Sequence, residues 1–133
     1  MKLHSNTDYA IRALRHLHKH DGELQTAWTI SQEIDTTYPR FVKIAKQLSK
    51  KGLVQAQLGV HGGFKLGRPA DKITVYDVYT AMEGDLQINA CMADEHRCEH
   101  GEQINCKVFN YFCGLQKSLI NELSAKTIAD FAD

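Results

Sequence analysis

All cysteines of this chain fall within one short segment. The sequence has 133 residues, and its four cysteines lie within 23 of them: Cys91, Cys98, Cys106 and Cys113. A thiolate is a soft, strongly donating ligand that suits iron, and it is also the group that oxidants attack. Structural zinc usually draws on tight Cys-x-x-Cys pairs, which are missing here. The segment indicates metal or redox chemistry, with a set of free thiols in a loop as the simpler alternative.

The surroundings of these thiols follow from the rest of the sequence. No apolar stretch approaches the roughly 20 residues that a membrane-spanning helix needs. The first eight residues lack the apolar core of a secretion signal. We therefore expect a cytoplasmic protein without a membrane partner, whose thiols stay reduced, and no disulfide framework.

A second group of residues with recognisable chemistry is cationic. Residues 41–54 have the pattern of a basic amphipathic helix that Gly52 stops, and residues 59–70 follow as a glycine-rich hairpin. Such a helix can enter the major groove of DNA while the hairpin touches the neighbouring backbone. We expect Arg40 and Lys43 to face the major groove and Lys65 to meet phosphate. The candidate DNA contacts are Tyr38, Arg40, Lys43, Lys46, His61, Lys65 and Arg68.

The charge distribution supports a nucleic-acid surface in the front half of the chain. Residues 1–72 carry twelve basic and six acidic side chains, a net charge of +6, whereas residues 73–133 carry four and ten, a net charge of −6. Neutralising phosphate requires clustered cations. A winged-helix adaptor that binds proteins without reading DNA has no need of this excess. No GxSxG, HExxH or phosphate-loop motif is present, so we do not expect an enzyme.

Periodicity predicts the elements that must position these groups. We expect helices over residues 7–20, 29–34 and 39–51 and wing strands over residues 53–57 and 64–66. Ser5 and Asp8 have the spacing of a capping box for the first helix, and Thr26 or Thr29 caps the second. The predicted inward-facing residues are Ala10, Ile11, Leu14, Leu17, Ile30, Ile34, Phe41, Ile44, Ala45 and Leu48.

The second half of the chain is expected to contain more helices. Thr74 caps a helix over residues 75–83 that ends at Gly84, and a long helix spans residues 105–124. Its apolar residues alternate in steps of three and four, as in a coiled-coil seam. The candidate dimer contacts are Phe109, Phe112, Leu119 and Leu123, with Val108, Leu115 and Ile120 as a second apolar flank. Residues 127–131 form a last short turn.

The expected fold class is mainly α: a winged helix-turn-helix with a small two-stranded wing and a long C-terminal dimerisation helix. Residues 1–84 would form the DNA-binding domain. Residues 85–104 show no periodicity and would form the cysteine-bearing loop, and residues 105–133 the dimerisation helix with a short terminal helix.

Several motifs resemble those of the winged-helix transcription regulators that include IscR and NsrR. They are TDYAIRAL at 7–14, VKI at 42–44, QL at 47–48, GLV at 52–54, GGFKLGRPA at 62–70 and ITVYDV at 73–78. The resemblance covers nearly the whole chain. It implies a homodimer, joined through the long helix, that binds a partly palindromic operator in double-stranded DNA and acts as a repressor.

The resemblance also implies an iron-sulfur cluster. In that family three cysteines of the loop hold the cluster, and Cys91, Cys98 and Cys106 occupy the matching places; 2Fe-2S and 4Fe-4S both stay open. Asp8 is the first choice for the fourth ligand, since NsrR-like members supply an aspartate there from the partner subunit. A simple carboxylate near the helix N-terminus is the alternative, and His96 and His100 are local alternatives as ligands. Cys113 is expected to pack as a small apolar group.

Two positions depart from that family. Leu58 stands just before the first wing glycine, where the family often places a cation that contacts the minor groove. The contact would then fall to His61 or Lys65. The third helix opens with Tyr38-Pro39-Arg40, which differs from the better-known members, so no operator sequence is carried over.

Overall fold

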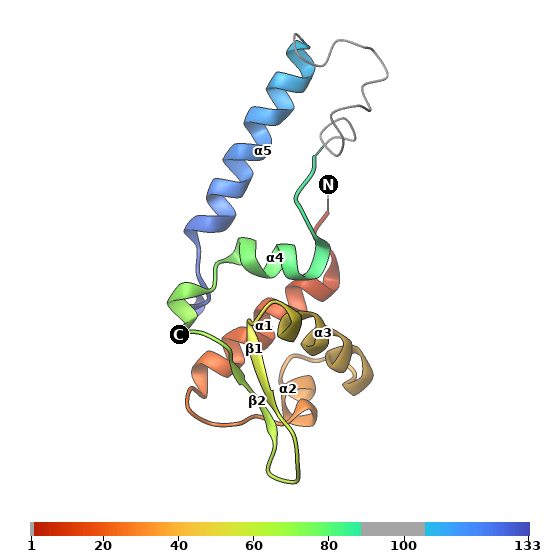
Figure 1. Cartoon of the computed structure of the whole chain (residues 1–133), viewed down its shortest axis with the longest axis vertical. Helices are drawn as coiled ribbons and strands as arrows, with labels where there is room; N and C mark the ends of the chain where they lie inside the picture. The colour runs from red at the N-terminus through yellow and green to blue at the C-terminus, as the bar shows by residue number, and fades with distance from the viewer. Residues whose placement is uncertain (1, 89–105) are drawn as a thin grey trace.

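The computed structural model describes residues 2–88 and 106–133 (Figure 1). A head of helices and one hairpin carries a long helix, α5, that rises away from it. In chain order the elements are α1 (Ser5–Lys19), α2 (Ala27–Glu33), α3 (Tyr38–Lys50), β1 (Val54–Gln57), β2 (Gly63–Leu66), η1 (Ala70–Lys72), α4 (Val75–Glu83), α5 (Lys107–Ala125) and η3 (Ile128–Phe131). The predicted fold class is confirmed. None of the helices in the described ranges is long and apolar enough to span a membrane.

The core of the head forms where α1, α2 and α3 bury their apolar stripes against one another. Leu14, Ile30, Phe41, Ile44 and Leu48 are fully buried, as the periodicity predicts. Three or four apolar residues per two turns suffice to cover one side of a short helix. Between α2 and α3 the chain turns sharply, and the non-glycine residue Asp35 takes a φ of +56° there, a conformation that aspartate tolerates better than most residues.

The predicted capping box of α1 is wrong. The helix begins at Ser5, and the capping residue is His4, whose Nδ1 accepts the N–H of Asn6 at 3.1 Å. Ser5 lies inside the helix, where its hydroxyl accepts a hydrogen bond from Arg40 instead. The helix therefore starts earlier than a Ser-x-x-Asp pattern indicates, because an imidazole nitrogen supplies the acceptor that the first turn needs. For α2 the cap is Thr26, whose hydroxyl accepts from the N–H of Thr29 at 3.1 Å.

The wing is the antiparallel hairpin of β1 and β2, and it is anchored to the helices through Phe64, which pairs with Ala56 near the tip end of the strands. Phe64 on β2 meets Phe41 of α3 edge to face, with ring centroids 5.7 Å apart. Gln25, just before α2, exchanges two backbone hydrogen bonds with Phe64, at 3.0 and 2.8 Å. The sequence did not predict this third, one-residue strand. It fixes the wing against the helices on its second edge.

The end of the described chain returns to the head after α5. The N–H of Ile128 donates to the carbonyl of Ile73 at 2.9 Å, and Thr127 forms a bridge with Thr74. Ile128 is fully buried in the core. The Thr127 N–H and hydroxyl both donate to Asp130, which lowers the pKa of that carboxyl. Residues 126–131 thus complete the head in addition to ending α5.

This packing predicts a large effect for a change far from the helix-turn-helix. Ile128→Ala should destabilise the protein by about 2–5 kcal/mol, because it removes a fully buried side chain and leaves a cavity. Urea unfolding followed by circular dichroism measures the change. Leu58→Ala, at an exposed wing position, is the matched control and should stay within about 0.5 kcal/mol of wild type. Equal stability of both variants would contradict the packing of residues 126–131.

Candidate nucleic-acid interface and cysteine site

The outward side of α3 is determined by what its inward side buries. Thr37 caps the helix, its hydroxyl accepting the N–H of Arg40 at 3.3 Å, and Pro39 occupies the first turn. With the apolar stripe turned toward the core, Lys43 and Lys46 are exposed as predicted. Tyr38 and Val42 lie beside them and are also exposed. This face therefore combines cations for phosphate or guanine with apolar groups that can meet a thymine methyl.

Arg40 does not share this free position. Its Nε donates to the Asn6 Oδ1 at 2.7 Å, and its Nη2 donates to the Ser5 hydroxyl. The guanidinium also lies over the ring of Tyr9, 4.7 Å from the centroid. These contacts direct the half-buried side chain toward α1. In this conformation Arg40 fastens the start of α3 to the start of α1, and reading a base would require it to release those partners.

The wing cations also differ in freedom. Lys65 is exposed on β2, opposite Gln55, and His61 is exposed at the hairpin tip. Arg68, in contrast, forms an ion pair with Asp77 of α4 at 3.1 Å, so part of its charge is neutralised by a carboxylate of its own chain. The charge of the surrounding sequence has a single sign. Residues 36–70, here termed the cationic stretch, contain seven basic side chains and no acidic one. An anionic partner suits this surface.

Sequence reasoning missed two exposed residues of the helix-turn-helix. Val42 is not among the predicted contacts, which on α3 are Tyr38 and the cations Arg40, Lys43 and Lys46. Trp28 of α2 is 62% exposed. Its exposure could have been predicted, because Trp28 does not share the helix face of the inward-facing residues Ile30 and Ile34. A large exposed aromatic side chain on a helix-turn-helix is a candidate contact to the sugar-phosphate backbone.

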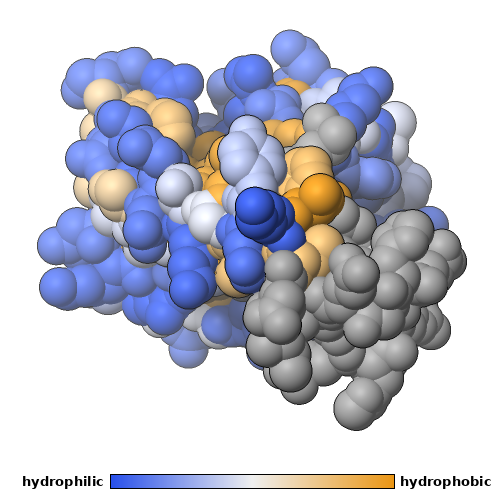
Figure 2. Space-filling model, turned by 90° about the horizontal axis from the view of Figure 1, so that it is seen from above, coloured by the Kyte–Doolittle hydropathy of each residue, from blue (hydrophilic) through white to orange (hydrophobic). Residues whose placement is uncertain are grey.

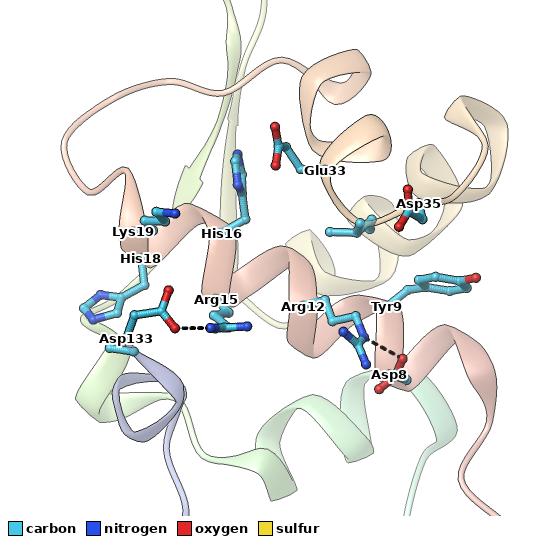
Figure 3. A pocket seen from close by; sticks show the side chains of 12 residues that line it. Asp8, Tyr9, Arg12, Arg15, His16, His18, Lys19, Glu33, Asp35 and Asp133 are labelled. Carbon is cyan, nitrogen blue, oxygen red and sulfur yellow. Dashed lines mark hydrogen bonds and ion pairs between the residues drawn. The ribbon is translucent and has the colours of Figure 1, made fainter.

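Asp8 lies in a polar groove beside α1 that the end of α2 and the last residues of the chain also line (Figure 3). Its Oδ2 accepts a hydrogen bond from the Arg12 Nε at 2.8 Å. This hydrogen bond and the negative charge of Asp8 raise the pKa of Arg12. Further along the groove, Arg15 pairs with Asp133 and donates to the Phe131 carbonyl. As a ligand, Asp8 would have to share its carboxylate with Arg12. Within residues 2–88 and 106–133, no three His, Cys, Asp or Glu side chains are arranged to hold a metal ion.

The two described cysteines occupy different places on α5. Cys106 is the capping residue of the helix, where its sulfur accepts the N–H of Phe109 at 3.4 Å. The helix thus begins after Cys106, two residues later than predicted. Cys113 lies within the helix and is half-buried. Seven residues of helical rise, roughly 10 Å, exceed the reach of a disulfide. Cys91 and Cys98, like His96 and His100, lie outside the described residues.

Helix α5 leaves apolar side chains uncovered along its length. None of its residues is fully buried, and Val108 and Tyr111 are 60% and 66% exposed. The predicted dimer contacts are half-buried: Phe109, Phe112, Leu119 and Leu123. Seen from the α5 end, hydrophobic surface gathers in the middle of this face (Figure 2). An amphipathic helix with this much open apolar surface is typical of one that packs against a further partner.

A cationic helix-turn-helix beside a wing, on a head that carries a long and partly uncovered helix, defines a winged-helix transcription regulator. The chain belongs to the Rrf2 family, described as an iron-dependent transcriptional regulator, whose sequence model matches residues 3–133. The resemblance that the motifs indicate is therefore confirmed.

Solved structures show the same fold. CymR, the global cysteine regulator of B. subtilis, is 21% identical with a TM-score of 0.80, over 99% of this chain and 96% of that one. IscR of T. potens is 23% identical with a TM-score of 0.75, over 98% and 85%. The oxidised form of Staphylococcus aureus CymR is 19% identical with a TM-score of 0.73, over 100% and 97%. At these identities the likeness concerns the fold.

Lys43 and Arg40 provide a matched pair of substitutions. Lys43→Ala should weaken binding to a selected DNA duplex by about 1–3 kcal/mol if it reads a base, without changing the melting temperature, since its side chain is exposed. Arg40→Ala should lower stability by about 1–2 kcal/mol, because Asn6 and Ser5 lose a charged donor. Fluorescence anisotropy and thermal unfolding measure the two effects. If Arg40→Ala has wild-type stability, the contacts with Asn6 and Ser5 do not stabilise the fold, and Arg40 is again a candidate DNA contact.

Proposed function

We propose that the chain is a homodimeric repressor that binds a partly palindromic operator in double-stranded DNA. The observation that carries this is the cationic stretch, which the fold presents on α3 and the wing of an Rrf2 member. In this proposal, α3 enters the major groove through Tyr38, Val42, Lys43 and Lys46. Lys65, His61 and, to a smaller extent, Arg68 contact the backbone beside it. Two copies would present two such helices, which matches a two-fold symmetric site.

The homodimer is supported by the open apolar surface of α5. One flank of this helix meets its own chain, where Gln116 accepts the N–H of Ile88 at 3.2 Å and α4 packs nearby. The seam through Phe112 and Leu119 stays half-open in the single chain. A second copy of α5 would cover it with side chains of the same kind.

The dimer has a direct test. Leu119→Glu would place an unpaired charge in the interface, and it should therefore convert the dimer into a monomer. Light scattering coupled to size exclusion measures the molar mass. Glu122→Gln on the exposed side of α5 is the control and should remain dimeric. A wild-type protein that is monomeric at micromolar concentration would refute the proposal.

For the sensor we propose a cluster held by Cys91, Cys98 and Cys106, with Asp8 as the fourth ligand. The family description as iron-dependent supports this. So does the position of Cys106, whose sulfur lies at the start of α5 beside the cysteine-bearing segment and receives an N–H. Hydrogen bonds to thiolate sulfurs set the properties of such clusters. When bound, the cluster would supply a redox-sensitive or ligand-sensitive centre.

The geometry around α1 suggests how such an event would reach the DNA-binding helix. Glu83, at the end of α4 and just before the cysteine-bearing segment, accepts from the Thr7 hydroxyl at 2.6 Å and the His4 N–H at 3.3 Å. Burial and the charge of Glu83 also raise the pKa of Tyr79 one turn earlier. The same turn of α1 binds Arg40 of α3. A shift of α4 would therefore act on the start of α3 through the first turn of α1.

A cluster-free regulator that senses thiol oxidation is the second candidate. The observation in its favour is that the thiol of Cys106 already has a structural partner, the N–H of Phe109. A neutral thiol can cap a helix without a metal, and its oxidation would remove that cap.

Single serine substitutions separate the two candidates. If the cluster is present, protein purified without oxygen should be coloured and contain iron and sulfide. Cys91→Ser, Cys98→Ser and Cys106→Ser should then abolish a reconstituted cluster. Cys113→Ser should retain it, because the helix fixes Cys113 about 10 Å from Cys106 along its axis. Asp8→Ala should alter the absorbance spectrum without preventing iron binding, since a carboxylate is the harder and more replaceable ligand.

Two results would redirect the assignment. Loss of the cluster in Cys113→Ser, with Cys106→Ser tolerated, would reverse the ligand set. Wild-type protein that binds no iron on anaerobic reconstitution, but changes its DNA affinity on treatment with peroxide, would establish the thiol-based regulator instead.

A further inference from the structure

The polar groove beside α1 carries opposite charges on its two sides (Figure 3). Its volume is about 680 Å³, a size at which other proteins bind small organic molecules. The α1 side carries the cations Arg12, Arg15 and Lys19. The other side carries the carboxylates of Glu33 and Asp35, which belong to the end of α2 and the turn after it. A molecule that spans the groove would meet positive charge on one side and negative charge on the other.

These charges have capacity for a further partner. Within the described residues, Lys19, Glu33 and Asp35 form no ion pair. Arg12 donates to Asp8 through its Nε, so its terminal N–H groups can meet a further acceptor. Single exposed charges are ordinary on a protein surface. Here they line the two sides of one hollow, where one ligand can meet them together.

The backbone at Asp35 indicates that this carboxylate has a use. Among the residues that the structure describes, Asp35 is the only one besides glycine with a positive φ, at +56°. Glycine adopts this conformation without strain, whereas aspartate and asparagine only tolerate it. An aspartate at this place therefore gives up some stability and adds a negative charge at the edge of the groove. Residues held in such conformations cluster at functional sites.

The core holds both sides of the groove in place. Ile34 lies between the two carboxylates in the chain and is only 6% exposed, so the end of α2 cannot move without disturbing the packing. On the opposite side, Leu14 and Leu17 are buried, which leaves Arg15 and Lys19 on the outer side of α1. The charges are thus in position before a ligand arrives, and binding does not have to order them.

We propose that this groove binds a small zwitterion, an amino acid or a short peptide, and that the bound molecule strengthens DNA binding. Its carboxylate pairs with the cations of α1, and its ammonium group pairs with Glu33 or Asp35. A molecule with one sign of charge could pair with one side only and would face like charge on the other. The effect on DNA rests on the proposed DNA-binding function, whereas the binding of the zwitterion does not.

The groove is close to the elements that hold the DNA-binding helix. Asp35 lies in the turn between α2 and α3, two residues before Thr37, which caps α3. Tyr9 also lines the groove, and its ring lies under the guanidinium of Arg40, 4.7 Å from the centroid. A ligand that joins α1 to this turn would hold α3 in the position that its buried stripe gives it. DNA would then bind a helix that is already ordered.

Nuclear magnetic resonance on the isotope-labelled full chain tests the binding. The probes are glycine and glycylglycine, which represent the free amino acid and the peptide. At least one should shift the amide signals of the groove saturably, with a Kd on the order of 1 mM, because the molecules are small and the groove is open. N-acetylglycylglycine lacks the ammonium group and glycylglycinamide lacks the carboxylate. Each should bind about fivefold more weakly than glycylglycine.

Asp35→Asn is the matched variant, because asparagine tolerates the positive φ and only the charge is lost. It should weaken binding of the probe about fivefold at an unchanged melting temperature, and Glu33→Gln should do the same. Asp71→Asn is the control. It removes an exposed carboxylate of η1 that does not line the groove, and it should bind the probe like wild type.

DNA binding tests the coupling. A duplex is first selected from a random pool with the wild-type protein, and its affinity is measured by fluorescence anisotropy. A saturating concentration of the zwitterion should tighten wild-type binding about fivefold. The double variant Glu33→Gln/Asp35→Asn should not respond at the same concentration, since its groove has lost the acidic side.

Each outcome decides a part of the inference. No saturable shift with either probe at tens of millimolar overturns it. Equal binding of the acetylated or amidated peptide overturns the zwitterion, and unchanged binding by the double variant places the ligand elsewhere. Binding without an effect on DNA affinity overturns the coupling. If the wild-type protein enriches no duplex from the pool, the proposed DNA-binding function fails, while the resonance data on the groove still decide whether the zwitterion binds.

Discussion

The burial of Phe41, Ile44 and Leu48 is the constraint on which the DNA-facing surface depends. These side chains fix the rotation of α3 against α1, and the helical period then determines which residues face outward. The ring of Phe41 also meets Phe64 of the wing. One aromatic residue in the core therefore sets the positions of both parts of the candidate interface, and the distance between helix and hairpin is not free to vary.

Local patterns were sufficient to predict most of the fold. Apolar periodicity predicted α1 and α3, because each helix buries one face and the period is visible within a few turns, whereas the Thr74 cap and Gly84 predicted α4. The capping box of Thr74 and Asp77 was equally local, and the hydrogen bonds at 2.9 and 3.0 Å bear out the predicted Thr74 cap. Glycine at the end of α4 and around the wing marked turns for reasons that belong to the backbone alone.

Some of the features that the sequence did not predict depend on partners distant in the chain, and others have local causes. The contacts of Arg40 with Ser5 and Asn6 were not predicted, because these partners are more than 30 positions away, and the predicted DNA contact of Arg40 stays a prediction. His4 became the cap of α1 for a local reason that a preference for Ser or Asp obscured. The pairing of Gln25 with Phe64 has no signature, since a single-residue strand has no period. The predicted start of the long helix, residue 105, is two residues too early. The helix begins at Lys107, and Cys106 is its capping residue instead of a residue inside the helix.

The return of residues 126–131 to the head has a consequence for how the protein is made. Ile73 and Ile128 are joined by a backbone hydrogen bond although 55 positions of sequence separate them. During synthesis the helix-turn-helix leaves the ribosome first, yet its core lacks Ile128 until α5 has also been translated. Contacts of such long range form late and slowly. A nascent chain therefore acquires its full stability only together with the helix that carries the candidate dimer surface, which ties completion of the DNA-binding head to readiness for assembly.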